Sequence, residues 1–191
     1  MSNLLIGSSN VYRNFERAIA TGCFSGRNLQ LVRCTKKAFF DTCISSLTVA
    51  DLVVTSVLEN FIVDGCTGVP DDEVQLFAHQ QVTAHVETLM SLTVRLPGVN
   101  VIICPPMFRS NPAWYGPYLS AIHAFLAAEV ARVGSRQLGV CAPFVAVPSL
   151  LEADGIHLTP SGDSRFLSYL DSGLHGLRTG GRGWYRCGCY G

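Results

Sequence analysis

Residues 51–58 read DLVVTSVL, a run of apolar and β-branched residues without Gly or Pro. Such a run is typical of a strand that is covered on both faces, as the strands of parallel sheets are. The pattern predicts a buried strand that ends at Glu59 and Asn60. Because parallel strands need long crossover connections, helices are expected before and after it along the chain.

Short apolar runs recur on both sides of this segment, separated by helical patterns. Strands are expected over residues 4–6, 29–32, 99–104 and 139–147, and helices over 11–20, 36–47, 71–96, 118–133 and 161–177. The helix over 71–96 has the clearest pattern, because its apolar positions recur every three or four residues and acidic residues begin it. The alternation predicts a three-layer α/β/α domain around a five-stranded parallel sheet.

The composition excludes several classes of protein. The chain has 191 residues, of which 48% are hydrophobic and 15% charged, so it is a packed globular chain and not a disordered one. Lys plus Arg and Asp plus Glu number 14 each, so the total charge favours no nucleic-acid partner. No apolar run reaches the ~18 residues of a membrane span, and residues 1–7 do not resemble a secretory signal.

The eight cysteines are scattered and are predicted to be free thiols, which favours an intracellular, cytoplasmic location. Only Cys187 and Cys189 are close neighbours, so no metal site is predicted. One domain is expected over residues 1–177, followed by a Gly- and Arg-rich tail over 178–191 that is expected to be flexible. Arg and aromatic residues alternate in this tail, so any nucleic-acid contact would be made there; a solvated tail is the simpler interpretation.

Ligands of parallel sheets bind beyond the carboxyl ends of the strands, so the residues that follow each strand are candidates for a site. These residues are Gly7-Ser8-Ser9-Asn10, Cys34-Thr35-Lys36, Glu59-Asn60, residues 105–109 and Asp154-Gly155-Ile156-His157. They include a hydroxyl, an imidazole, a carboxylate and amide donors, which are the groups that acyl transfer requires. Ser9 also begins a predicted helix, whose dipole favours a developing negative charge there.

Together these blocks resemble the SGNH (GDSL) hydrolases, a family of esterases and acyl hydrolases, over residues 4–174. Gly7-Ser8-Ser9 is similar to the Gly-Asp-Ser block of that family, and Asp154-Gly155-Ile156-His157 matches its Asp-x-x-His block. The resemblance implies a flavodoxin-like fold and no cofactor. It also implies that Ser9 is the nucleophile, His157 the base and Asp154 the carboxylate that orients the base.

The resemblance further implies an oxyanion hole formed by the Ser9 N–H, the Asn60 side chain and the N–H of Thr35 or Lys36. The sequence departs from the family at Ser8, where an Asp is usual, and at Phe61, where an Asp often follows the Asn. A Gly that normally follows the second strand is also missing. These departures put the rate in doubt more than the type of reaction. They are similar to a divergent branch found in proteins of some retrotransposons.

Several site residues have a simpler alternative role. Ser9 can be a helix cap and Asn60 an Asx turn. Arg109 lies beyond the fourth strand, in a loop where Phe108, Trp114 and Tyr115 are expected to shape a pocket and Arg109 to contact a polar or anionic part of the substrate. A packed surface loop is the alternative.

The sequence therefore predicts a serine esterase that hydrolyses small or lipid-like carboxylic esters through an acyl-enzyme intermediate. The alternative is a catalytically weak or inactive binding or assembly module, such as one in a mobile-element protein. A flavodoxin-like cofactor binder is disfavoured because no G-x-x-x-x-G-K-[ST] phosphate loop is present.

Overall fold

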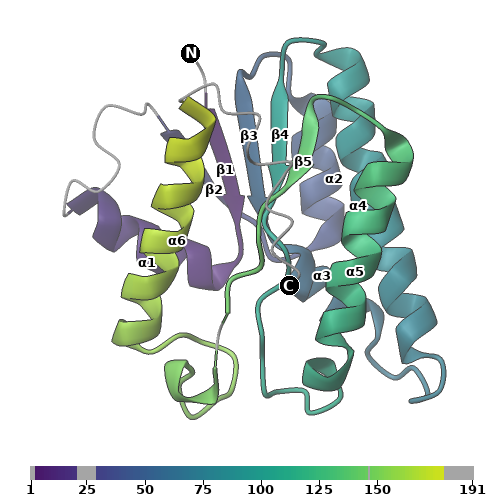
Figure 1. Cartoon of the computed structure of the whole chain (residues 1–191), viewed down its shortest axis with the longest axis vertical. Coiled ribbons are helices and arrows are strands. Elements are labelled where there is room, and N and C mark those ends of the chain that lie inside the picture. The colour runs from purple at the N-terminus through teal and green to yellow at the C-terminus, as the bar shows by residue number, and fades with distance from the viewer. Residues whose placement is uncertain (1–2, 21–28, 146, 179–191) are drawn as a thin grey trace.

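A computed structural model describes residues 3–20, 29–145 and 147–178 of the chain (Figure 1). Its five strands are all parallel and form one sheet in the order β2-β1-β3-β4-β5. They are β1 (Asn3–Gly7), β2 (Leu29–Arg33), β3 (Leu52–Ser56), β4 (Asn100–Ile103) and β5 (Leu138–Val140). This arrangement confirms the predicted fold class.

Helices cover both faces of the sheet. They are α1 (Ser9–Ala20), α2 (Lys37–Ser46), α3 (Leu58–Gly65), α4 (Val74–Arg95), α5 (Tyr115–Val133) and α6 (Pro160–Arg178), with a 3₁₀ turn η1 (Pro148–Leu150) before α6. Figure 1 shows α1 and α6 on one face and α2, α4 and α5 on the other. No helix in the described ranges is both long enough and apolar enough to cross a membrane.

Two hydrophobic cores result from the alternation of side chains along the strands. Leu4 and Ile6 of β1 join the core beneath α2, α4 and α5, whereas Leu5 joins the core beneath α1 and α6. β3 and β4 alternate in the same way, so the three central strands are buried on both faces, whereas the described residues of the edge strand β2 are half-buried or exposed. This burial explains why the strands are continuous apolar runs in the sequence.

Three strands are shorter than predicted, β3, β4 and β5, and β4 loses only one residue at each end. β3 ends at Ser56, and Leu58–Gly65 is the helix α3, which the sequence pattern did not indicate. Val57 and Leu58 are both fully buried. An apolar run in a sequence indicates that its residues are buried, but it does not distinguish a strand from the start of a helix. β5 ends at Val140 instead of continuing to residue 147, and Pro143 in that stretch has no amide hydrogen for a sheet.

The strand ends are aligned at one edge of the sheet. Gly7 at the end of β1 is in register with Arg33 of β2 and Ser56 of β3. The segments that follow these strands therefore start side by side.

The five cysteines in the described ranges are free thiols, as predicted. The predicted tail lies outside the described residues apart from Arg178.

Candidate active site

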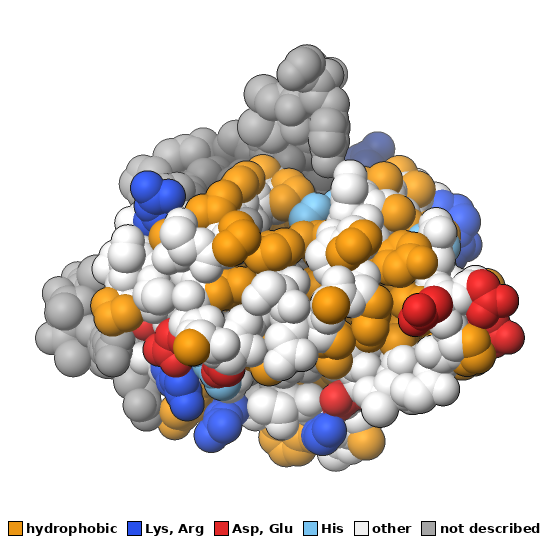
Figure 2. Space-filling view, turned by 90° about the horizontal axis from the view of Figure 1, so that it is seen from below, with side chains coloured by type: hydrophobic (Ala, Val, Ile, Leu, Met, Phe, Trp, Pro, Cys, Tyr) orange, Lys and Arg blue, Asp and Glu red, His pale blue; other side chains and the backbone are white. Residues whose placement is uncertain are grey.

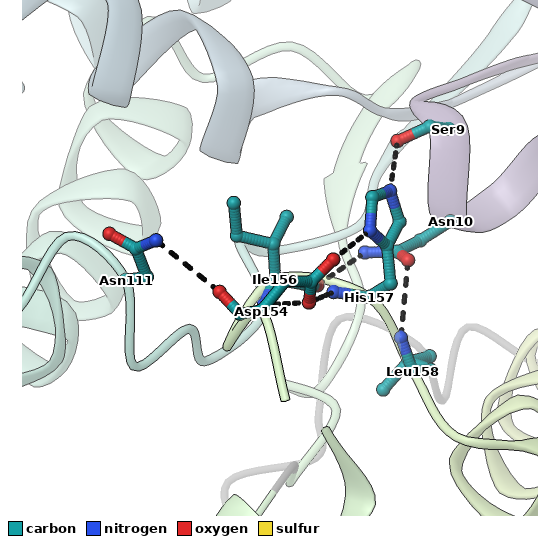
Figure 3. Close-up of polar contacts among 7 residues, drawn as sticks. All are labelled: Ser9, Asn10, Asn111, Asp154, Ile156, His157 and Leu158. Carbon is teal, nitrogen blue, oxygen red and sulfur yellow. Dashed lines mark hydrogen bonds and ion pairs between the residues drawn. The ribbon is translucent and has the colours of Figure 1, made fainter. Parts of the chain in front are cut away.

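Ser9, His157 and Asp154 come together at this edge of the sheet (Figure 3). The Ser9 Oγ lies 3.4 Å from the His157 Nε2, and the His157 Nδ1 lies 2.5 Å from the Asp154 Oδ2. An ionised carboxylate can only accept, so Nδ1 carries the ring proton and Nε2 accepts from the Ser9 hydroxyl. The three groups are thus arranged in the order in which a Ser-His-Asp triad transfers a proton.

The turn that presents Ser9 depends on Gly7. A Cβ at Gly7 would lie 2.3 Å from a methyl carbon of Val11, so a side chain there would collide with α1. The Ser8 N–H donates to the Ser56 carbonyl at 2.9 Å, which ties this turn to the end of β3. Ser9 is the first residue of α1, where the amide hydrogens point out of the helix and its positive end lies.

The loop from Asp154 to His157 is held by its own backbone. The Asp154 Oδ1 accepts the N–H groups of Ile156 at 2.8 Å and His157 at 2.9 Å. The hydrogen bonds from the His157 backbone and ring and from the Ile156 backbone hold the pKa of Asp154 well below its usual range. The carboxylate is therefore ionised at neutral pH.

Gly155 allows this loop to turn sharply. Its φ is +69°, in the left-handed region that favours glycine. Its carbonyl accepts the Ser110 N–H at 3.0 Å, and Asn111 donates from its side chain to the Asp154 carbonyl at 3.3 Å (Figure 3). The loop after β4 thus supports the loop that carries His157.

Asn10 is a site residue to which the sequence analysis assigned no role. Its side chain is almost fully buried, donates to the Ile156 carbonyl at 3.0 Å and accepts the Leu158 N–H at 3.4 Å. These two bonds bracket His157, as Figure 3 shows. The signal in the sequence was its position directly after Ser9, one residue into the helix.

The three predicted oxyanion donors lie at the ends of three adjacent strands. Ser9 follows β1 and Asn60 lies in the first turn of α3, just after β3. Thr35 follows β2, where the Cys34 N–H donates to the Gly7 carbonyl at 2.8 Å. Thr35 and Asn60 are half-buried, and within the described ranges no acceptor occupies the N–H of Ser9 or Thr35.

Arg109 and Tyr115 are buried, contrary to the prediction that both border the substrate. Arg109 is only 5% exposed, and its guanidinium donates to the Asn60 Oδ1 and lies 3.9 Å from a carboxylate oxygen of Glu59. Tyr115 belongs to the core beneath α5. The buried Glu59 carboxylate attracts the positive charge of Arg109 into the interior. The sequence of the loop that carries Arg109 does not reveal this contact. Phe108 and Trp114 are half-buried and remain candidates for the pocket.

One group of side chains has the composition of a metal site. One possible ligand atom each from Glu152, Asp154 and His157 lies within 4.8 Å of the others. Both ring nitrogens of His157 are already engaged, by Asp154 and Ser9. A cation at this position would have to displace one of those contacts, so these residues fit the triad better than a metal centre.

The edge that carries the triad is largely apolar. Figure 2 views the molecule from below Figure 1, onto this edge, and hydrophobic side chains occupy much of its centre. Val145 and Val147, which follow β5 before η1, are 76% and 41% exposed. Such an apolar surface suits contact with an uncharged organic group of a ligand.

Comparisons with known proteins identify solved structures that have a similar fold. No protein-family model matches the sequence, and no curated protein matches it. Among solved structures, a carbohydrate esterase family 3 protein from Talaromyces cellulolyticus has a TM-score of 0.63 at 14% identity, over 95% of this chain and 99% of that one. An acetyl esterase mutant crystallised with an acetate ion has a TM-score of 0.61 at 15% identity, over 94% and 98% of the two chains.

A GDSL-like lipase from Bacteroides thetaiotaomicron has a TM-score of 0.61 at 12% identity, over 92% of this chain and 88% of that one. These structures share an α/β fold with a parallel sheet. The chain therefore has the fold of the SGNH (GDSL) hydrolases, as the resemblance of its sequence implied.

Proposed function

We propose that the protein is a serine hydrolase of carboxylic esters. The observation that carries the proposal is the continuous chain of contacts from the Ser9 hydroxyl through the His157 ring to the Asp154 carboxylate. A cap role for Ser9 alone would not require an imidazole at 3.4 Å from its hydroxyl. The neighbouring structures support the proposal, because they are described as esterases and a lipase.

In the proposed reaction the Ser9 Oγ attacks the ester carbonyl carbon while the His157 Nε2 takes the hydroxyl proton. Asp154 remains ionised and stabilises the resulting imidazolium. The negative oxygen of the tetrahedral intermediate accepts hydrogen bonds from the Ser9 N–H, the Asn60 side chain and the Thr35 N–H. Collapse of the intermediate breaks the bond to the alcohol, which leaves with the proton from His157.

The acyl group is then bound to Ser9 as an ester. A water molecule gives its proton to the His157 Nε2 and attacks the acyl carbon, and collapse of the second intermediate returns the proton to the Ser9 Oγ and releases the carboxylic acid. Every step uses side chains and backbone amides of the chain itself. We propose small or lipid-like esters as substrates, because hydrophobic side chains occupy much of the centre of the face in Figure 2. We also propose that Phe108 and Trp114 line the acyl pocket.

Hydrolysis of p-nitrophenyl acetate and of a longer-chain p-nitrophenyl ester tests this proposal. Wild type is expected to hydrolyse at least one ester and to react with a fluorophosphonate probe, and Ser9→Ala is expected to lose both signals. Ser8→Ala is the matched control, because Ser8 is adjacent in sequence but fully buried with an unbonded hydroxyl. A folded wild type with neither signal would contradict the proposal and favour a binding module on the same fold.

A further inference from the structure

The amide of Asn60 is held in one orientation by a buried charge. A guanidinium nitrogen of Arg109 donates a short hydrogen bond to the Asn60 Oδ1. A guanidinium has only donors, so the oxygen end of the amide must face it and the NH₂ end must point away. Within the described ranges no acceptor occupies this NH₂ group. The contact therefore leaves both amide hydrogens of Asn60 available at the end of β3.

The negative charge of Glu59 holds the guanidinium of Arg109 next to Asn60. Glu59 is fully buried, and one of its carboxylate oxygens lies 3.9 Å from the same guanidinium nitrogen that binds Asn60. Neither carboxylate oxygen has a hydrogen bond, and the Nε of Arg109 has none either. The hydrogen bond to Asn60 is thus the specific contact of the guanidinium, and Glu59 supplies the compensating charge.

Stability does not explain this arrangement. Burial of two charges costs free energy that a pair recovers only with good geometry and further hydrogen bonds. The guanidinium has its bond to Asn60, but among the described residues both Glu59 oxygens and the Arg109 Nε have none. A cationic donor on the amide oxygen has another effect, because it draws electrons from the amide and makes its N–H groups stronger donors. Incompletely satisfied polar groups of this kind are expected where function requires them.

We propose that Arg109 is a positioning residue that aims and polarises the Asn60 amide as an oxyanion donor, with Glu59 as its counter-charge. This inference rests on the proposed function, and it replaces the expected contact between Arg109 and the substrate. The stabilised charge exists only in the tetrahedral intermediate and the transition states around it. Loss of Arg109 therefore lowers kcat and leaves KM nearly unchanged.

A double-mutant cycle tests the inference through kcat. The pair change Glu59→Gln with Arg109→Met removes both buried charges at similar volume, so the variant is expected to fold, as circular dichroism will verify. We expect about a 10-fold to 100-fold lower kcat for this variant and about 100-fold or more for Asn60→Ala. With all three changes, kcat should equal that of Asn60→Ala alone, because Arg109 acts through Asn60. Arg109→Lys, which also only donates, should retain part of the effect.

A second readout does not depend on turnover. The side-chain amide signals of Asn60 in a ¹H–¹⁵N spectrum, assigned by their loss in Asn60→Ala, should move in the Glu59→Gln/Arg109→Met variant and stay near their wild-type positions in Arg109→Lys. Unmoved signals, or losses of kcat that multiply in the combined variant, would overturn the role of Arg109. If the signals move but wild type shows no Ser9-dependent hydrolysis, the proposed function fails and the orientation of Asn60 by Arg109 stands.

Discussion

Asn10 donates a 3.0 Å hydrogen bond to the carbonyl oxygen of Ile156, so the helix that begins with Ser9 is bonded directly to the segment that carries His157. Ser9 and His157, the proposed nucleophile and base, come from opposite ends of the described residues, and their contact is 3.4 Å long. A small shift between the two segments would break that contact. Asn10 limits the shift by bonding to the residues before and after His157.

Asn10→Ala is therefore expected to lower kcat about 10-fold to 100-fold with a smaller effect on KM, because displaced reacting groups lose their alignment. Steady-state kinetics with a p-nitrophenyl ester measure both constants. Asn14→Ala is the matched control, since Asn14 is one turn further along α1 and equally buried, but its amide has no hydrogen bond. Equal losses of kcat in the two variants would contradict the role of Asn10.

Gly155→Ala should disturb the catalytic loop. At a φ of +69° an alanine is strained, and its Cβ would lie 2.4 Å from the Ser110 Oγ and 3.2 Å from the Asn111 backbone nitrogen. We expect a loss of about 1–3 kcal/mol in unfolding free energy and at least a 10-fold lower kcat. Urea unfolding and steady-state kinetics measure the two effects.

Gly134→Ala is the control for this change. Gly134 has a similar φ of +62° at the end of α5, but its nearest atom to a new Cβ is 4.0 Å away. The control should lose about 1 kcal/mol of stability and keep its kcat. A Gly155→Ala variant with the kcat of wild type would show that the loop tolerates the change.

Asp154→Asn separates the charge of the carboxylate from its structural role. An amide oxygen can still accept the N–H groups of Ile156 and His157, so the loop should persist. The amide NH₂ then faces the His157 Nδ1 and can only donate to it, so the ring is held in the opposite tautomer and the imidazolium also loses its counter-charge. We expect kcat to fall about 10²-fold to 10⁴-fold. A variant with nearly full kcat would show that His157 does not need the charge of Asp154.

The lowered pKa of Asp154 also predicts the direction of a stability difference with pH. Because the folded protein favours the ionised form, its stabilisation is complete above the ordinary Asp pKa of about 3.9 and is lost as the pH falls from there towards the lowered value. The difference in unfolding free energy between wild type and Asp154→Asn should therefore be constant near neutral pH and decrease only in acid. Urea unfolding across this range measures it.

His85 makes the fold sensitive to mild acid. It is 1% exposed, stacks on Phe40 and lies 3.3 Å from the Thr55 hydroxyl, and burial, followed by the nearby Lys37 charge, lowers its pKa to about 3. The unfolded chain takes up the proton more readily, so stability is lost as the pH falls below about 6.5. Between pH 7.5 and 5.0 this contributes about 2 kcal/mol to the loss.

The His85→Gln variant should lose less stability over the same interval, because glutamine does not titrate and can still bond to Thr55. Urea unfolding of both proteins at the two pH values provides the comparison. Equal losses in wild type and variant would assign the acid sensitivity to other groups.

The layers of the fold were predictable because burial on both faces leaves continuous apolar strands, and a strand such as Leu52–Ser56 is apolar whatever its neighbours are. The helix α3 was not predictable in this way. Val57 and Leu58 continue the buried apolar run of β3, so the sequence does not mark the boundary between the strand and the helix, which packs against α4. Asn60 consequently lies within a helix and not in a turn after a strand.

The triad could be proposed from sequence because its residues occur in short blocks with fixed internal spacing. The contacts of Asn10 and Arg109 could not, because each joins segments far apart in the chain. Asn10 binds residues 146 and 148 positions away, and Arg109 binds Asn60, 49 positions away. A charged residue in a loop is usually exposed, and only the fold reveals that Glu59 is buried beside Arg109.

The separation of 148 positions between Ser9 and His157 also determines when a growing chain becomes competent. A ribosome that adds about 5–20 residues per second takes about 7–30 s to progress from the nucleophile to the base. Throughout that interval the nascent chain carries Ser9 without the imidazole of His157. If the proposed function holds, hydrolysis can begin only after the last strand and the loop beyond it have been synthesised and released from the exit tunnel.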